Sequence, residues 1–430
     1  MFGARRLRAF AGLGASLLGS LLGWLLIAPI AALVPKRRDW IAVIGKQDGM
    51  LLDNAKFFFL QATMSEPGLR IVWVTERDDT TALRCHGCEA LKYPGLASLW
   101  FLLRCAVAVV DEAAWFRRGR IFLLKRAAVV QLWHGVGFKR IELDQWRNEA
   151  RRVRWISHPL VLSLRLLVYR VTGRRMRYAV VATTSPFYRD QVFKPAFLAR
   201  HFAVTGYPRN DFGRCLRDAF SELAWSNVDA GVKQQLEAWK RLGRRLVLVA
   251  PTFRDSGSVP MHLADQALRA IDAFAEEHGV EFIFKFHPFE RHTDHIAGRH
   301  FHVCARDSDI YPLFPHTDAL VTDYSSISMD FLLVDKHLLF LIPDDEDYVQ
   351  NDRQLQFDPC TMMPGPVVPD WRALLAALLA EWTHDSHAGE RAILRRKAFD
   401  DLPQAEAVPK LLALMREQGW ISGVPSHDRH

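Results

Sequence analysis

Short polar side chains gather between an apolar run and a helix-like run near residue 325. The stretch reads ALVTDYSSISMDFLLVD and contains Asp323, Ser325 and Ser326. One Ser or Asp is enough to cap a helix, which is the plain structural explanation. A run of them at a helix N-terminus, where backbone N–H groups are unpaired, also suits a bound phosphate. The stretch therefore predicts either a capped helix or an anion site.

A second candidate lies in the stretch QLWHGVGFKR, which follows an apolar run. It places His134 directly before Gly135, with Lys139 four residues farther on. Glycine permits a tight turn and close approach by a ligand, and an imidazole in such a turn is suited to act as a general base. The alternative is a histidine with a structural role in a loop.

Charged side chains follow three further strand-like runs. APTFRDSGS contains Arg254 and Asp255, and FKFHPFE contains Lys285 and His287. Basic side chains are common phosphate ligands, and an aspartate is able to orient them or to accept from a ribose hydroxyl. PDDEDY adds Asp347, whose carboxylate is suited to ribose or acceptor hydroxyls.

Several common catalytic signatures are missing from the sequence. It contains no GxxxxGK[ST], GxGxxG, HExxH or GxSxG motif and no protein-kinase signature set. Its one CxxC, Cys85 to Cys88, has no second pair to complete a zinc site, so we expect no metal ligands. A candidate base, a cationic wall and a hydroxyl-rich helix start suit transfer from a nucleotide-linked donor to an alcohol.

The elements that must position these residues alternate between strand and helix. A chain of 430 residues favours two domains, and short apolar runs separated by helical stretches predict parallel β/α/β units. The predicted fold class is α/β, with two facing Rossmann-like domains. Ligands of such sheets bind at the carboxyl ends of the strands, where the polar clusters stand. The predicted divisions are an anchor helix in 1–38, a first domain in 39–212, a hinge in 213–243 and a second domain in 244–430.

Basic charge is concentrated in two segments. Residues 1–38 carry +6 and residues 147–177 carry +8, whereas the whole chain carries only +8. Both segments are also rich in apolar residues, which is typical of a membrane surface and argues against nucleic acid as the partner. For 147–177 a solvated basic helix packed on its own domain is the alternative.

The first segment contains an uncharged run of 26 residues, Ala9 to Val34. This length is sufficient to cross a hydrocarbon core of about 30 Å. We expect a membrane anchor that either spans the bilayer or lies in its interface. A cleaved signal peptide and a buried core helix are the alternatives.

Taken together, these motifs resemble those of the CDP-glycerol glycerophosphotransferases that prime or polymerise teichoic-acid-type chains. The similar segments are WHG with its following Lys, PTFRD, KFHP, TDYSSISMDFLLVDK and PDDEDY, together with TGYPRND and LLDNAKFFF. The resemblance covers residues 40–350. The loop WHGVG departs from the family pattern, which usually has Thr or Ser after the glycine.

The resemblance implies a GT-B fold and a membrane-associated enzyme at the cytoplasmic face of the cell membrane. It would move glycerol phosphate from CDP-glycerol to a hydroxyl of a lipid-linked saccharide or polymer, with release of CMP. A transferase for CDP-ribitol or a nucleotide sugar, and a non-catalytic membrane scaffold of the same fold, are the alternatives. Whether a divalent metal assists stays open.

The resemblance also assigns roles to the candidate residues. His134 would deprotonate the acceptor. The expected site comprises catalytic His134 and His287, donor-binding Arg254, Asp255, Lys285, Asp323, Ser325, Ser326 and Asp347, and acceptor-side Gly135 and Lys139.

Overall fold

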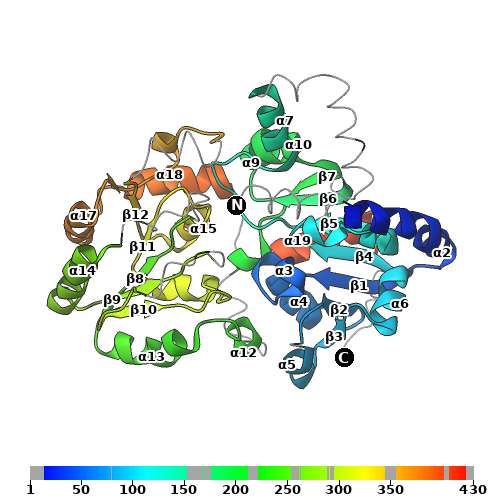
Figure 1. Cartoon of the computed structure of the whole chain (residues 1–430), viewed down its shortest axis with the longest axis horizontal. Coiled ribbons are helices and arrows are strands. Elements are labelled where there is room, and N and C mark those ends of the chain that lie inside the picture. Colours follow the sequence, from blue (N-terminus) through cyan, green and yellow to red (C-terminus); the bar gives the residue numbers. More distant parts are fainter. Residues whose placement is uncertain are drawn as a thin grey trace, which may run out of the picture. The chain divides into compact units, whose positions relative to one another are not determined.

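The computed structural model describes residues 14–78, 80–152, 167, 176–211, 221–252, 261, 263–287, 290, 295–343, 355–400 and 406–422. The chain forms two compact units. The first comprises Met1–His134, Ile141–Ala224 and Leu402–His430, and the second Gly135–Arg140 and Trp225–Asp401. Each unit is built around one parallel sheet with helices on its faces, which confirms the predicted α/β class (Figure 1).

The first unit has a seven-stranded sheet in the order β3-β2-β1-β4-β5-β6-β7. Its strands are rich in Val, Ile and Ala and are largely buried, as expected of a parallel sheet covered on both faces. The order reverses between β1 and β4, which are hydrogen-bonded neighbours. The strand bounds are β1 Arg37–Ile44, β2 Arg70–Thr75, β3 Glu89–Lys92, β4 Cys105–Val110, β5 Ala128–Gln131, β6 Arg177–Thr183 and β7 Leu198–Val204.

Helices of the first unit differ in burial. In α4, every residue from Asp53 to Ala62 is buried, so this helix is part of the core. A helix over Gly14–Leu33 is long and apolar enough to cross a membrane. The other helices include α5 Thr80–Cys85, α6 Leu96–Arg104, α7 Glu142–Arg152, α12 Ser221–Ala224 and α19 Ala407–Glu417, with α4 ending at Ser65.

The second unit has a six-stranded sheet in the order β10-β9-β8-β11-β12-β13, with its reversal between β8 and β11. Its core contains Phe282, Phe284 and Leu339 from the strands and Leu374 and Leu378 from a covering helix. The element bounds are β8 Arg245–Val249, β9 Val280–Phe284, β10 Phe301–Val303, β11 Ala319–Thr322, β12 His337–Leu341, β13 Val367–Val368, α13 Ala230–Arg241, α14 Asp265–His278, α15 Ile327–Phe331, α17 Trp371–Thr383 and α18 Ala388–Phe399.

The two units divide the chain differently from the sequence-based domain boundaries. Much of the expected hinge is α13, whose Val232, Leu236 and Trp239 are buried at helical spacing in the second unit. Residues 402–430, expected in the second domain, belong to the first unit. There the apolar face of α19 packs on α4, and the backbone N–H of Ser422 donates to Arg38 (3.1 Å).

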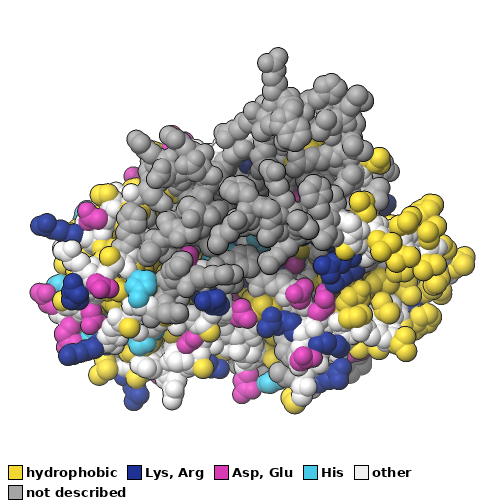
Figure 2. Space-filling model, viewed as in Figure 1, with side chains coloured by type: hydrophobic (Ala, Val, Ile, Leu, Met, Phe, Trp, Pro, Cys, Tyr) yellow, Lys and Arg dark blue, Asp and Glu magenta, His cyan; other side chains and the backbone are white. Residues whose placement is uncertain are grey.

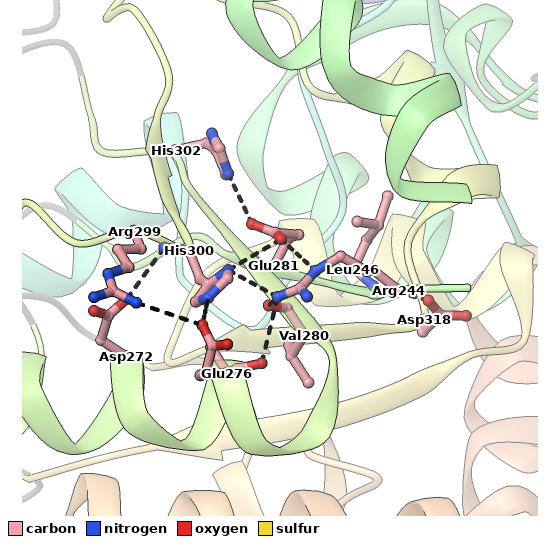
Figure 3. A network of polar contacts seen from close by, with 11 residues as sticks. Arg244, Leu246, Asp272, Glu276, Val280, Glu281, Arg299, His300, His302 and Asp318 are labelled. Carbon is pink, nitrogen blue, oxygen red and sulfur yellow. Dashed lines mark hydrogen bonds and ion pairs between the residues drawn. The ribbon is translucent and has the colours of Figure 1, made fainter. Parts of the chain in front are cut away.

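A buried carboxylate lies near the amino end of β9 in the second unit. Glu281 is 4% exposed and forms an ion pair with Arg244. Its oxygens lie 3.1 Å from Nδ1 of His300 and 2.9 Å from Nε2 of His302, and Nε2 of His300 lies 2.7 Å from Glu276 (Figure 3). This network joins β9 and β10 to α14 at the edge opposite the carboxyl ends.

Candidate functional site

Polar residues of the first unit meet at the carboxyl ends of its central strands. Lys46 comes two residues after β1, Asp111 directly follows β4, and His134 comes three residues after β5. The strand order reverses between β1 and β4. Ligands of open α/β sheets bind at this kind of edge, so the position favours a functional role for the group.

The ring of His134 has a defined orientation. Its Nδ1 lies 3.1 Å from the backbone oxygen of Asp111, and because a carbonyl oxygen only accepts, Nδ1 carries the proton. Trp133 (φ +58°) and Gly135 (φ +143°) turn the chain sharply on either side, and the Trp133 ring packs against the imidazole with centroids 4.0 Å apart. The neutral ring therefore has its lone pair on Nε2, the form that a general base requires.

A buried ion-pair cluster supports this loop from within the same unit. Asp53 and Arg209 are 2% and 0% exposed and pair with each other, and Asp53 also pairs with Lys46. Nη1 of Arg209 donates to the backbone oxygen of His134 (3.1 Å). Burying charges is costly unless they are paired and hydrogen-bonded, as these are.

Asn54 links the cluster to the histidine loop by its amide. Its Nδ2 donates to the backbone oxygen of Trp133 (2.9 Å), and its Oδ1 accepts from the backbone N–H of Arg209 (3.2 Å). The residue is 0% exposed. The conformation of the loop around His134 is therefore held by buried side chains that come from distant parts of the chain.

Charges near His134 shift its pKa. Burial and the Lys46 ammonium lower the pKa of His134 to about 4. The side chain is also in contact with solvent, which screens these effects. Burial raises the pKa of Asp111 well above its usual range, whereas Arg209 and Lys46 hold the pKa of Asp53 low against the effect of its own burial.

The sequence analysis predicts His134 as a site residue but does not name the residues that hold its loop. Lys46, Asp53, Asn54, Asp111 and Arg209 were not among the predicted site residues. Part of the signal is in the sequence, because LLDNAKFFF and TGYPRND contain three of these residues and resemble recurring family segments.

In the second unit, a polar residue also lies where the strand order of the sheet reverses, between β8 and β11. Asp323 follows β11 and is 0% exposed, and its Oδ1 accepts from the backbone N–H (2.8 Å) and the hydroxyl (2.6 Å) of Thr252, just beyond β8. Asp323 therefore fixes the start of the loop after β8. Arg254 and Asp255 of that loop, and Asp347, lie outside the described residues.

The serine turn is built differently from a capped helix. Ser326 precedes α15 with helical backbone angles, and its side chain makes no capping hydrogen bond. The backbone oxygen of Ser325 accepts from the N–H (3.3 Å) and the hydroxyl (2.9 Å) of Ser328. The structure limits α15 to five residues, so the helix dipole that the sequence predicts at this turn is small.

Residues 135–140 pack against this turn within the second unit. A Cβ on Gly137 would lie 3.0 Å from the Cβ of Ser326, and the rings of Phe138 and Tyr324 are 6.3 Å apart. Lys139 forms an isolated antiparallel bridge with Leu355. Residues 135–140 are thus in contact with the predicted phosphate-binding turn of the same unit.

Two further predicted residues follow β9. Nζ of Lys285 donates to the backbone oxygens of Phe286 (2.9 Å) and Arg306 (2.7 Å), so it helps to order the loop. His287 is exposed. Their proposed roles as donor ligand and catalytic residue stay predictions.

Among the described residues, one group has metal-ligand chemistry at suitable separation. Ligand atoms of His337, Glu381 and Asp385 lie within 4.8 Å of one another. The group lies at the amino end of β12, away from the Asp323 turn, and Asp385 is paired with Arg391. The positive charge of Arg391 opposes a cation there, and we assign no metal to it.

Comparison with known proteins gives a consistent result. A sequence model described as CDP-Glycerol:Poly(glycerophosphate) glycerophosphotransferase matches residues 26–412. The teichoic acid ribitol-phosphate polymerase TarL of Staphylococcus aureus is 26% identical over 271 residues, which are 62% of this chain and 43% of that protein. The teichoic acid glycerol-phosphate transferase of the same organism is 26% identical over 299 residues, 65% of this chain and 68% of that one.

The chain therefore spans less than half the length of the first of these relatives. Among solved structures, a variant of the wall teichoic acid polymerase TagF is similar with a TM-score of 0.67 and 18% identity, covering 93% of each chain. This likeness confirms the predicted GT-B-like fold.

Proposed function

Because the chain belongs to the CDP-glycerol:poly(glycerophosphate) glycerophosphotransferase family, we propose that it transfers glycerol phosphate from CDP-glycerol to a hydroxyl of a lipid-linked saccharide or polymer. The product would be a teichoic-acid-like or capsular polymer, made at the cytoplasmic face of the cell membrane. The observation that carries this proposal is the oriented imidazole of His134 at the sheet edge, held beside Lys46 and Arg209.

In the proposed reaction, His134 acts as the general base. The acceptor hydroxyl gives its proton to Nε2 while its oxygen attacks the β-phosphorus of CDP-glycerol. The new oxygen–phosphorus bond forms as the bond from that phosphorus to the bridging oxygen breaks, and CMP leaves with the electron pair. The hydrogen bond from Nδ1 to Asp111 keeps the ring in the required tautomer.

The cluster around His134 has a charge suited to this chemistry. Lys46 and Arg209 are both paired to one carboxylate, Asp53, and the raised pKa of Asp111 favours its neutral form. The group then carries about one net positive charge, which keeps the free imidazole neutral and attracts a phosphate. A bound diphosphate would in turn raise the basicity of His134.

For the donor we propose the second unit. Asp323 orders the loop after β8, and the hydroxyls of Ser325 and Ser326 are at the start of α15. Gly137 of the same unit packs on Ser326, so residues 135–140 lie against this serine turn. The proposed donor ligands are Arg254, Asp255, Lys285, Asp323, Ser325, Ser326 and Asp347, with His287 as a second catalytic residue.

CDP-ribitol is the second candidate donor. The similarity to a ribitol-phosphate polymerase equals that to a glycerol-phosphate transferase at 26% identity, so both alcohols are candidates. The site residues proposed above would contact the diphosphate and the acceptor. None of them is proposed to contact the glycerol or ribitol part of the donor.

Direct assay of the full chain distinguishes these donors. Purified protein is incubated with a lipid-linked saccharide acceptor and one of three donors: CDP-glycerol, CDP-ribitol or a UDP-sugar. The masses of the products are then measured by mass spectrometry. We expect acceptor mass to increase by whole glycerol phosphate units and CMP to be released in equal amount. Turnover of CDP-ribitol or a UDP-sugar alone would reject the glycerol assignment.

A further inference from the structure

The helix over Gly14–Leu33 has two chemically different faces. Ser16, Ser20, Ala28 and Ala31 are at most 4% exposed, and Gly23 is also buried. The opposite face carries large exposed apolar side chains, at Leu17, Leu18, Leu21, Leu22, Trp24, Leu25, Leu26, Ile30 and Leu33. A helix that crosses a bilayer alone would need no such division.

The face with small residues is in close contact with the first unit. A Cβ on Gly19 would lie 2.7 Å from the backbone oxygen of Arg118, and one on Gly23 would lie 2.6 Å from the Phe122 ring. Near the other end, Nη1 of Arg126 donates to the backbone oxygen of Ala32 (2.8 Å). The helix is therefore docked along most of its length on residues 118–126.

Its exposed face is part of a larger apolar surface. Figure 2 shows a broad yellow area at the right of the view, where Figure 1 places α2 (Ala28–Leu33), the last part of this helix. Leu96 (89% exposed) and Trp100 (51% exposed) of α6 add to the exposed apolar side chains, and α6 and the N-terminal helix both contact residues 120–124. Soluble monomers rarely expose so many large apolar side chains together.

Charge near this surface favours anionic lipid as the partner. Residues 113–127 contain five basic side chains and no acidic one, and residues 14–38 contain three basic and no acidic ones. The guanidinium of Arg104 lies 5.2 Å from the Trp100 ring centroid. Tryptophan and basic residues together are typical of the boundary between lipid headgroups and acyl chains.

We propose that the helix over Gly14–Leu33 lies in the plane of a single leaflet, docked on the first unit by its small residues, and does not cross the membrane. Its large apolar face and the exposed residues of α6 enter the acyl region together. To span, the helix would have to leave residues 118–126 or carry Arg118 and Arg126 toward the bilayer centre, which is costly. The proposal rests on the membrane association proposed above and specifies its geometry.

The test is protease accessibility of both chain ends. The full chain, with an epitope tag at each end, is synthesised in a cell-free system with sealed vesicles of phosphatidylglycerol and phosphatidylcholine, and protease is added outside. We expect flotation with the vesicles and removal of both tags. Protection of the amino-terminal tag alone would show a spanning helix and overturn the proposal.

Substitutions test the surface itself. Leu18→Glu and Leu25→Glu should each lower the vesicle-bound to free ratio by at least about tenfold, because a charge replaces an inserted apolar side chain. Leu242→Glu, at a 74% exposed leucine of the second unit, is the matched control and should bind like wild type. Equal binding by all three variants contradicts the proposal. The proposal is also contradicted if the wild-type chain does not bind vesicles and forms dimers. The apolar surface would then be the contact with a second copy of the chain.

Transfer from CDP-glycerol to a lipid-linked saccharide acceptor is measured on the same preparations. If wild type is inactive but its tags are both cleaved at the vesicle surface, the proposed function fails and the membrane geometry stands. If wild type is active and its amino-terminal tag is protected, the proposed function stands and the proposed membrane geometry fails.

Discussion

Nδ1 of His134 lies 3.1 Å from the backbone oxygen of Asp111, which fixes the tautomer of the ring. The bond joins the loop after β5 to the end of β4, its neighbour in the sheet. The histidine is therefore positioned by the sheet itself, and its Nε2 is left as the proton acceptor.

Replacing the proposed base should abolish transfer without removing donor binding. We expect His134→Gln to lower kcat by about 10²- to 10⁴-fold, the usual contribution of a general base. Affinity for CDP-glycerol, measured by calorimetry, should change little. An active His134→Gln variant would show that another group accepts the proton.

The pH profile should report the charges around His134. A general base works in its neutral form, so activity is lost as pH falls through its pKa, and Lys46 lowers that pKa. Lys46→Met should therefore move the acidic limb of kcat/KM to higher pH. Lys92→Met, at an exposed surface pair with Asp78, is the control and should leave the limb in place.

Breaking the buried ion-pair cluster should destabilise the first unit. Arg209→Met leaves Asp53 paired to Lys46 alone and removes the donor to the backbone oxygen of His134. Loss of one partner of a buried pair costs about 3–5 kcal/mol, which denaturant unfolding would measure. The exposed pair of Arg189 with Asp190 supplies the control, because Arg189→Met should leave stability within experimental error. A stable Arg209→Met protein would contradict the structural role.

Two neighbouring serines should behave differently. Ser326 makes no capping hydrogen bond, so Ser326→Ala should leave stability unchanged and raise KM for the donor by about tenfold if the hydroxyl binds phosphate. Ser328 donates to the backbone oxygen of Ser325 and is buried, so Ser328→Ala should cost about 1 kcal/mol. Unchanged KM in Ser326→Ala would remove that residue from the donor site.

The second unit should lose stability as pH rises through the pKa of His300. Burial alone would lower this pKa, but hydrogen bonds to Glu276 and Glu281 raise it above its ordinary value, in spite of Arg244 at 2.7 Å from Nδ1. The stabilisation is complete below the unfolded-state pKa and is lost as pH rises through the folded-state value. Glu281→Gln should flatten this part of the stability–pH curve, measured by thermal unfolding at several pH values.

The predicted pH dependence has a control variant and an outcome that would contradict it. His278→Gln changes the histidine at the end of α14 and should leave the slope of the curve unchanged. If Glu281→Gln keeps the wild-type slope, protonation of His300 does not contribute to stability in the way proposed.

Local patterns determined the class of fold and the edge where the chemistry lies. Apolar runs such as AVAVV and LVLVA predict buried parallel strands because only a sheet covered on both faces buries every side chain, and both are strands, β4 and β8. Polar residues directly after such strands must stand at the carboxyl edge. That reasoning is sufficient to place His134 and Asp323 at their sheet edges.

Only the tertiary structure decided what surrounds them. Asp53 and Arg209 are 156 residues apart and pair because α4 and the loop after β7 meet in the fold. Sequence spacing carries no information on such a contact, since it depends on how strands are ordered in the sheet. The same holds for the N-terminal helix: hydropathy predicts an apolar segment, but only its packing on residues 118–126 shows which face stays exposed.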